Sequence, residues 1–451
     1  MIVSATAKSE QAKQAFLHAY TAVRDRGGDR PWLAAMRERA IERFADLSFP
    51  TRKNEDWKYT NVAPLFDAGL DPAARPADIA AERVQALVDA ALAGAEAPVL
   101  VFAGGRLLPG PSRVDGEAAL RIESLADAVG EDQPLLHGRL GALLDESAHG
   151  FAALNAAFVR DGACVTIAED QAASAPVHLV FIGSGGVTQP RNLIVAEPGS
   201  RATVIEHYIG ATDACYLTNA VTEIELGRGA SLTHIKVQRE SAAAFHVVRI
   251  EVKQEEGSTF SSYAVGLGAR LSRTELRTRL QAPGAQCELF GLYAVGGRRH
   301  CDHHTMVDHA APRTSSVELY KGIVDDGARG VFTGHVLVRP DAQKIDASQS
   351  NKNLLLADGA VAETRPQLEI YADDVKCSHG ATVGRLDEEA LFYMRARGIG
   401  RARARAILTG AFAAEVLERL PETGVRAALT ADVRSWLDRT ERGTDAEEQG
   451  S

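Results

Sequence analysis

Cysteine is scarce in this sequence of 451 residues, which holds five cysteines and no C-x-x-C pair. The odd number and wide spacing argue against a disulfide framework and are typical of a reducing compartment. They also argue against a self-contained zinc or iron–sulfur site, which needs closely spaced thiolates. The five thiols are Cys164, Cys215, Cys287, Cys301 and Cys377.

Long hydrophobic runs are absent as well. No stretch of about 18 apolar residues occurs, and the first twenty residues lack the apolar core of a signal peptide. We therefore expect no membrane span and a cytoplasmic location. Acidic residues outnumber basic ones, 60 to 50, and the net charge of −10 argues against whole-protein attraction to nucleic acid or an anionic membrane.

Three common catalytic signatures are missing too. The sequence has no G-x-x-x-x-G-K-[ST] loop, no G-x-G-x-x-G between a strand and a helix, and no G-x-S-x-G elbow. We therefore expect no P-loop ATPase here, and no nucleotide bound by this chain. We also find no nucleophile–base–orienter set, so catalysis by this chain alone is not predicted.

What is present divides the chain into three regimes. Residues 1–160 have mainly helical periodicity, with one apolar run over 97–103 that predicts a strand. Residues 161–386 consist of short β-branched runs separated by glycine turns, which predicts β structure. Residues 387–439 are helical again, and the polar tail 440–451 is predicted to be disordered. The predicted class is mainly β with helical ends.

The turns of the β region repeat as x-x-Gly-Ala/Ser, with spacings of 30, 28, 27, 43 and 32 residues. A period near 30 without helices favours a β-solenoid, although an antiparallel sandwich with regular hairpins stays open. We expect glycine to supply a positive φ at each corner. We attribute the 43-residue interval to an insertion at a histidine-rich stretch. The glycines are Gly199, Gly229, Gly257, Gly284, Gly327 and Gly359.

One thiol and one imidazole lie close together near the end of the β region. If residues 375–379 form a strand, Cys377 and His379 point to the same face, about 7 Å apart. Together they could ligate one metal ion or one edge of a cluster. Two ligands do not close a site, so other strands or a partner must complete it. A buried cysteine beside a hydrogen-bonded histidine is the simpler interpretation of the spacing.

A second candidate is the segment His300-Cys-Asp-His-His-Thr-Met-Val-Asp-His309. On a strand, His300, Asp302 and His304 share one face. A metal site at His300 and His304, and with it a stand-alone metal-dependent enzyme, is one hypothesis. Stacked polar side chains on a strand are the other interpretation.

The third candidate is the arginine-rich turn at residues 394–405. It resembles a helix-hairpin-helix, in which backbone amides at the glycine turn hold a DNA phosphate. A helical pair with a solvated basic face explains the same residues, and the net acidity of the chain favours that interpretation.

Several motifs together carry a family resemblance. Residues 348–399, with Lys376-Cys-Ser-His-Gly-Ala-Thr382 at their centre, closely resemble the SufB/SufD family of iron–sulfur assembly proteins, in its SufD form. Residues 52–60 resemble the N-terminal signature of that form. His304-Thr-Met-Val-Asp-His309, Tyr320-Lys-Gly and Val331-Phe-Thr-Gly334 resemble the family core.

The resemblance implies a right-handed parallel β-helix flanked by N-terminal and C-terminal helical domains. It also implies a scaffold subunit, not an enzyme, that pairs with a SufB-like subunit through the β-helix and docks a SufC-like ATPase. The isolated chain could form a homodimer. Neither nucleic acid nor a membrane is an implied partner.

The resemblance also assigns residues. His379, with Cys377 beside it, would carry a transient iron–sulfur cluster shared with the SufB-like subunit, and reduced flavin is a candidate electron carrier of the complex. The ATPase would dock on the helices after Asp387, where Leu391, Phe392, Tyr393 and Arg397 are the candidate contacts.

Overall fold

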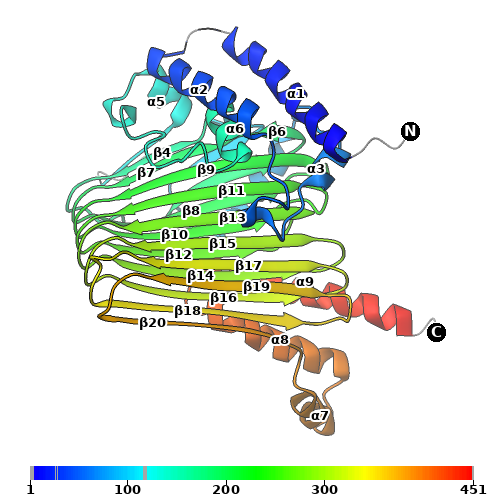
Figure 1. The fold of residues 1–451 in the computed structure, drawn as a ribbon. Helices are drawn as coiled ribbons and strands as arrows, with labels where there is room; N and C mark the ends of the chain where they lie inside the picture. The colour runs from blue at the N-terminus through cyan, green and yellow to red at the C-terminus, as the bar shows by residue number, and fades with distance from the viewer. Residues whose placement is uncertain (1–4, 26, 28, 115–118, 449–451) are drawn as a thin grey trace.

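The computed structural model describes residues 5–25, 27, 29–114 and 119–448. Its body is a β-solenoid of about 8 turns with helices at both ends of the chain (Figure 1). Each turn contributes one strand to each of two facing sheets, here named sheet A and sheet B. The predicted solenoid is confirmed, and neighbouring strands within the solenoid pair in parallel.

Sheet A has ten strands. In spatial order they are β2 (Arg106–Leu107), β1 (Val99–Ala103), β5 (Val177–Gly183), β8 (Arg201–Gly210), β10 (Ser231–Arg239), β12 (Thr259–Gly266), β14 (Gln286–Val295), β16 (Ser315–Val324), β18 (Ile345–Leu355) and β20 (Val375–Gly384).

Sheet B lies opposite, and its order runs from the last coil to the first. The strands are β19 (Val361–Ile370), β17 (Arg329–Val338), β15 (His300–His309), β13 (Leu271–Leu280), β11 (Phe245–Gln254), β9 (Tyr216–Leu226), β7 (Arg191–Ala196), β4 (Ala163–Ile167) and β3 (Leu120–Ser124). The short β6 (Gly186–Thr188) also pairs with β9.

The helical regions supply the remaining elements. Those of the N-terminal region are α1 (Ala5–Arg24), α2 (Pro31–Leu47), η1 (Glu55–Trp57), α3 (Ala63–Asp67), α4 (Ala81–Leu92), α5 (Leu125–Gly130), η2 (Pro134–Leu136) and α6 (Gly150–Phe158). Those of the C-terminal region are α7 (Glu388–Ala396), α8 (Arg401–Leu417) and α9 (Thr423–Glu448).

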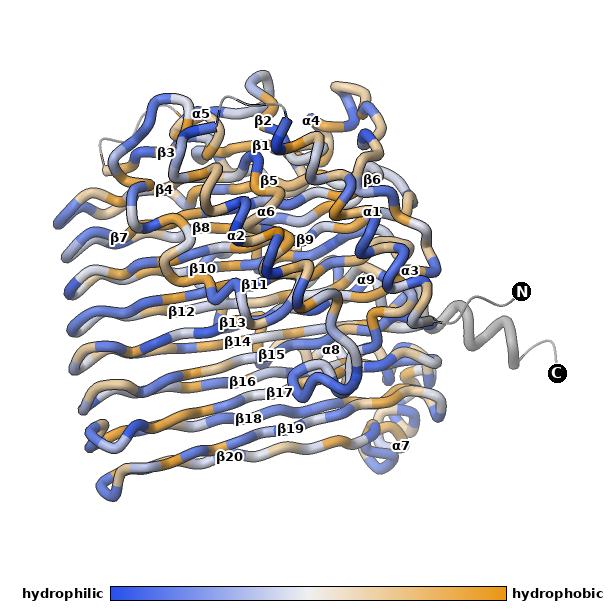
Figure 2. Tube along the Cα trace, turned by 45° about the horizontal axis from the view of Figure 1, so that its top comes forward, coloured by the Kyte–Doolittle hydropathy of each residue, from blue (hydrophilic) through white to orange (hydrophobic). Residues whose placement is uncertain are grey.

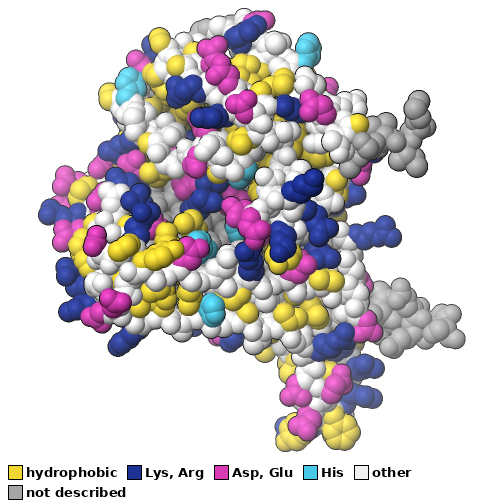
Figure 3. Space-filling view, in the orientation of Figure 1, with side chains coloured by type: hydrophobic (Ala, Val, Ile, Leu, Met, Phe, Trp, Pro, Cys, Tyr) yellow, Lys and Arg dark blue, Asp and Glu magenta, His cyan; other side chains and the backbone are white. Residues whose placement is uncertain are grey.

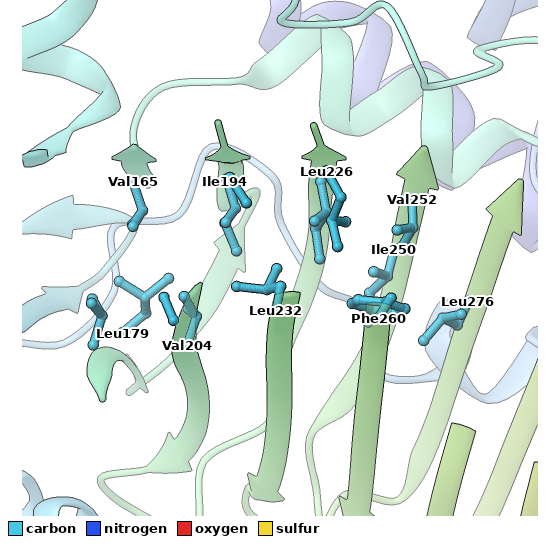
Figure 4. Packing of buried hydrophobic residues seen from close by; sticks show 14 of the residues in the cluster. Val165, Leu179, Ile194, Val204, Leu226, Leu232, Ile250, Val252, Phe260 and Leu276 are labelled. Carbon is cyan, nitrogen blue, oxygen red and sulfur yellow. The ribbon is translucent and has the colours of Figure 1, made fainter. Parts of the chain in front are cut away.

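The core of the solenoid lies between the two sheets. Alternate residues of each strand point inward, because successive side chains of a strand face opposite sides. Figure 2 shows hydrophobic and hydrophilic residues alternating along the strands. In Figure 4, side chains such as Val204 and Leu232 of sheet A and Ile194 and Leu226 of sheet B point toward one another.

Helices cover the outer faces of the sheets. Helices α1, α2 and α6 pack Phe16, Phe44 and Phe151 against Leu217 and Val221, which face outward from β9 of sheet B. Helices α8 and α9 cover the outer face of sheet A, and α4 covers its beginning. Among the described residues, no helix combines the length and the apolar character that crossing a membrane requires.

The turns correct one sequence prediction. Gly199, Gly229, Gly257 and Gly284 have positive φ, between 64° and 76°, and all lie where the chain passes from sheet B to sheet A. At the next turn of this kind, Arg313 takes the left-handed conformation with φ of 58°. Arg313 lies 29 residues after Gly284, so the solenoid period continues there without a glycine.

Gly327 and Gly359 lie in the opposite turns, which lead from sheet A to sheet B, and neither has a positive φ. At the first of these turns Asp326 has the positive φ, 48°. A Cβ on Gly359 would lie 2.9 Å from the carbonyl oxygen of Asp326, so close approach requires that glycine. The 43-residue interval is therefore one coil plus half a coil. The predicted insertion is wrong, because the histidine-rich stretch is the regular strand β15.

Both ends of the chain also differ from expectation. The N-terminal region contributes β1, β2 and β3 to the sheets, where one strand was predicted. Helix α9 runs to Glu448, so residues 440–448 of the tail predicted to be disordered are helical. This stretch contains no proline, and an established helix gains one hydrogen bond for each residue it adds. Residues 449–451 lie outside the described residues.

Candidate functional site

Cys377 and His379 lie on β20, the last strand of sheet A. This strand pairs with β18 along one edge, and its other edge meets no strand of the described residues. In the parallel register Cys377 lies opposite Ala347, and His379 lies opposite Gln349. Ala347 and Gln349 are buried positions of β18, so both site residues belong to the interior face of the last coil.

The two side chains differ in environment. Cys377 is partly buried and packs beside the small apolar cluster around Ile345 and Ala347. Burial raises the pKa of the Cys377 thiol, and the carboxylate of Asp346 raises it further. The thiol is therefore protonated at neutral pH and is a weak ligand until a metal displaces the proton. His379 is exposed at the open end of the solenoid.

A column of polar side chains leads inward from His379. Glu318 on β16 lies opposite Gln349, which lies opposite His379. The Gln349 side-chain amide donates to Oε2 of Glu318 at 3.3 Å, and the Thr305 hydroxyl donates to the same oxygen at 2.8 Å. Burial raises the pKa of Glu318 to about 7. A buried carboxyl that holds a proton near neutral pH thus lies two strands from the exposed histidine.

The predicted metal residues His300 and His304 lie on β15, far from the open edge of sheet A. The Thr60 hydroxyl contacts the His300 ring at 2.8 Å and donates to Asp302 at 2.5 Å, while Arg273 forms an ion pair with Asp302. Burial lowers the pKa of both histidines to about 4, with nearby arginine charges adding to the effect. Both rings are therefore neutral at physiological pH.

This segment therefore anchors the N-terminal region to the outer face of sheet B. Within residues 5–25, 27, 29–114 and 119–448, no group of three or more His, Cys, Asp and Glu side chains is arranged to hold a metal ion. The carboxylate of Asp302 is already paired with Arg273. The geometry therefore gives the hypothesis of a metal-dependent enzyme no ligand set.

Buried polar residues of the solenoid core were not singled out from the sequence. His234 and Lys236 on β10 face inward, as does His246 on β11. The His246 ring lies 2.6 Å from a Glu240 carboxylate oxygen, and burial lowers the pKa of Lys236 to about 8. The sequence does contain a signal for their position. His234 and Lys236 lie two and four residues after Leu232, a core residue, so all three share one face of the strand.

Three candidate docking residues lie on helix α7, and the fourth, Arg397, follows its last residue. Helix α7 comes after β20 and projects away from the solenoid (Figure 1). Leu391 is buried, whereas the side chains of Phe392 and Tyr393 are 73% and 60% exposed. The guanidinium of Arg397 lies 4.4 Å from the Tyr393 ring centre and donates to its hydroxyl at 2.6 Å. Figure 3 shows hydrophobic side chains gathered at the end of this projection. Large exposed aromatics of this kind mark interaction surfaces.

The arginine-rich turn connects α7 with α8. Gly398 has φ of 85°, and Gly400 precedes the first turn of α8. Two of its arginines contact protein groups: Arg397 contacts Tyr393, and Arg405 donates to the carbonyl oxygen of Leu356 at 3.0 Å. The other three arginines of the segment, Arg395, Arg401 and Arg403, are exposed, which fits the alternative of a helical pair with a solvated basic face.

Two family models match this chain in succession. The model described as "SufBD protein N-terminal region" matches residues 10–179, and "SUF system FeS cluster assembly, SufBD core domain" matches residues 180–412.

Curated relatives match over most of their length. An iron–sulfur cluster assembly SufBD family protein of Synechocystis is 33% identical, covering 88% of this chain and 89% of the relative. The iron–sulfur cluster assembly protein SufD of Escherichia coli is 31% identical, covering 88% and 91%. SufD of Bacillus subtilis is 28% identical, covering 89% and 93%.

Proposed function

This chain belongs to the SufBD family of iron–sulfur cluster assembly proteins, and from that premise we propose that it is the SufD-like scaffold subunit of a SUF complex. It acts in the cytoplasm and assembles clusters without being an enzyme itself. Supporting this proposal, the sequence carries the SufD form of the Lys376–Thr382 motif, and it resembles SufD proteins of two bacteria over most of their length.

The open end of the solenoid is the proposed contact with a SufB-like subunit. The edges of β19 and β20 present unpaired backbone groups, and a second β-helix could continue both sheets there. In the absence of that partner, a second copy of this chain could take the same place as a homodimer.

His379 is the proposed ligand that this chain contributes to a nascent cluster, which is the cargo of the complex. An exposed imidazole binds iron and releases it more readily than a thiolate does, which suits a cluster that must leave. Cys377 takes second place, because its raised pKa opposes formation of the thiolate. The SufB-like subunit supplies the remaining ligands.

Helix α7 is the proposed docking site for a SufC-like ATPase. The exposed Phe392 and Tyr393 offer apolar anchors, Leu391 holds the helix in place, and Arg397 orients the Tyr393 ring. Strand β20, which carries Cys377 and His379, is followed directly by this helix in the chain. Movement of α7 would therefore act on β20. Nucleotide is bound by the ATPase subunit, and reduced flavin is a suitable electron carrier for the complex.

The observation that carries this proposal is the exposed His379 on the last strand of sheet A, whose outer edge meets no strand of the described residues. In a co-expressed complex with SufB-like and SufC-like partners, we expect His379→Ala to lower iron and sulfide per complex at least fivefold, and Cys377→Ala to lower them less than twofold. His18→Ala, which removes an exposed histidine from α1, is the matched control. Full cluster loading of an intact His379→Ala complex would contradict the assigned role.

A further inference from the structure

A cavity of about 770 Å³ lies between residues 52–64 and the turns that lead from sheet A to sheet B. Five arginines line it: Arg52, Arg270, Arg298, Arg299 and Arg329. They come from four separate stretches of the chain, which the solenoid and the N-terminal segment bring together. In a chain with a net charge of −10, this is a strong local excess of positive charge.

The solenoid repeat stacks these arginines along one corner. The main-chain N–H of His300 donates to the carbonyl oxygen of Arg270, and the N–H of Arg329 donates to that of Arg299, each at 2.9 Å. Arg270 and Arg299 thus occupy adjacent coils, and neighbouring strands lie only about 4.8 Å apart. Like charges repeated at this spacing repel one another, so an anion between them would be stabilising.

The nearby acidic groups do not neutralise this corner. Arg329 pairs with Glu363 at 2.7 Å, and Asp326, which lines the cavity, accepts the Gly297 N–H at 3.1 Å. Two main-chain carbonyls hold Arg299, at 3.0 and 3.1 Å. The remaining lining arginines, Arg52, Arg270 and Arg298, form no ion pair with any residue of the described ranges.

We propose that this cavity binds a phosphate-bearing anion of nucleotide size through the guanidinium groups of Arg270, Arg298 and Arg52. Planar guanidinium groups donate paired hydrogen bonds that match phosphate oxygens, and the volume lies in the range of small-molecule sites. Tyr59 and Asn61 also line the cavity and supply an aromatic face and an amide for an attached ring. The cavity is separate from the open edge at β20, so this site does not depend on the proposed scaffold function.

Binding is tested on the full chain by isothermal titration with inorganic pyrophosphate, ADP and FAD, each at low salt. We expect saturable binding with one site per chain for at least one of these probes. The double variant Arg270→Ala/Arg298→Ala should weaken that binding at least tenfold. Arg228→Ala removes an exposed arginine from the opposite corner of the solenoid and should change it less than twofold.

The three probes distinguish the sources of the phosphate. Equal affinity for all three would support an inorganic anion, whereas tenfold tighter binding of ADP or FAD would support an organic ligand whose ring Tyr59 contacts. In the latter case Tyr59→Leu should return the affinity to that of pyrophosphate. Absence of saturable binding for all three probes, or an unchanged affinity in the folded double variant, would overturn the proposal.

Discussion

The two ends of the solenoid both consist of β-strands, but the strands at the two ends differ in burial and in how their edges are paired. At the first end, antiparallel strands β2 and β3 end the two sheets, and the strands β1 and β4 with which they pair are almost wholly buried. At the other end, β20 is exposed along nearly its whole length and has a free edge. A solenoid coil buries its faces only against the next coil, so a last coil without a cap is a place for a partner.

The charges at the two ends show the same contrast. Near the first end Arg191 pairs with Glu223 at 2.6 Å, and both side chains are fully buried. At the other end Arg385 pairs with Asp358 at the same distance, yet their side chains are 58% and 94% exposed. The distance between the charged atoms does not by itself decide how much an ion pair stabilises the fold. Removing one charged side chain is costly only where water cannot solvate the charge that remains.

The largest expected effect tests this contrast directly. Arg191→Ala leaves Glu223 buried without its cation, although the main-chain N–H groups of Gly141 and Leu143 still donate to the carboxylate at 2.8 Å each. We expect the free energy of unfolding to fall by about 3–5 kcal/mol. Arg385→Ala, the matched substitution at the exposed end, should change it by less than about 1 kcal/mol. Urea denaturation measures both, and equal losses would refute the comparison.

The next effect concerns Glu318, which lies two coils inside the open end. Its pKa rises from 4.5 to about 7 on burial, so between these values the folded chain holds a proton that the unfolded chain has lost. Stability therefore falls as the pH rises through this window, by about 3 kcal/mol if the whole shift is realised.

Glu318→Gln removes this titration. Between pH 5 and pH 8 we expect the variant to gain about 3 kcal/mol relative to the original chain in urea denaturation. Glu256→Gln, at an exposed turn, is the control and should leave the pH profile unchanged. A Glu318→Gln profile parallel to that of the original chain would show that this carboxyl is not protonated in the folded state.

The smallest effect on stability is expected at the open end itself. Val383 on β20 is 45% exposed, so Val383→Lys should change the free energy of unfolding by less than about 0.5 kcal/mol. The same change should prevent pairing with a SufB-like subunit, because it places a buried charge in the proposed interface.

Size-exclusion chromatography of the mixed subunits measures this pairing. Val317→Lys, at a 41% exposed valine away from the open end, is the matched control and should pair normally. If both variants form the heterodimer equally well, the SufB-like subunit binds elsewhere on this chain. The exposed last coil would then not be the pairing surface.

Much of the fold could be predicted from local patterns. Period-2 alternation and the recurring glycine turns indicate a solenoid, because each coil has nearly the same length and needs the same corner. The same reasoning failed at the interval between Gly284 and Gly327, because Arg313 adopts a left-handed turn without a glycine and the glycine signal changes corner. Residue type encodes turn geometry only in part. The turn at Arg313 has no glycine, and the resulting long interval between glycines therefore suggested an insertion that the structure does not contain.

The candidate site shows the same division. The adjacency of Cys377 and His379 follows from two residues on one strand, and the motif around them identifies the family. The column from His379 through Gln349 to Glu318 could not be predicted, since it joins three strands whose register depends on the lengths of all intervening turns. The arginine cavity joins even more distant stretches.

By itself, the sequence determined the class of protein, the repeat, the family motif and the wide spacing of the five cysteines. These features depend on composition or on residues close together in the chain. For such residues, backbone geometry already fixes which side chains share a face or a turn. Only the tertiary structure decided which end of the solenoid has a free strand edge, which carboxyl is buried and which arginines line one cavity. Those properties depend on burial and on contacts between coils, and burial is a property of the whole packed chain.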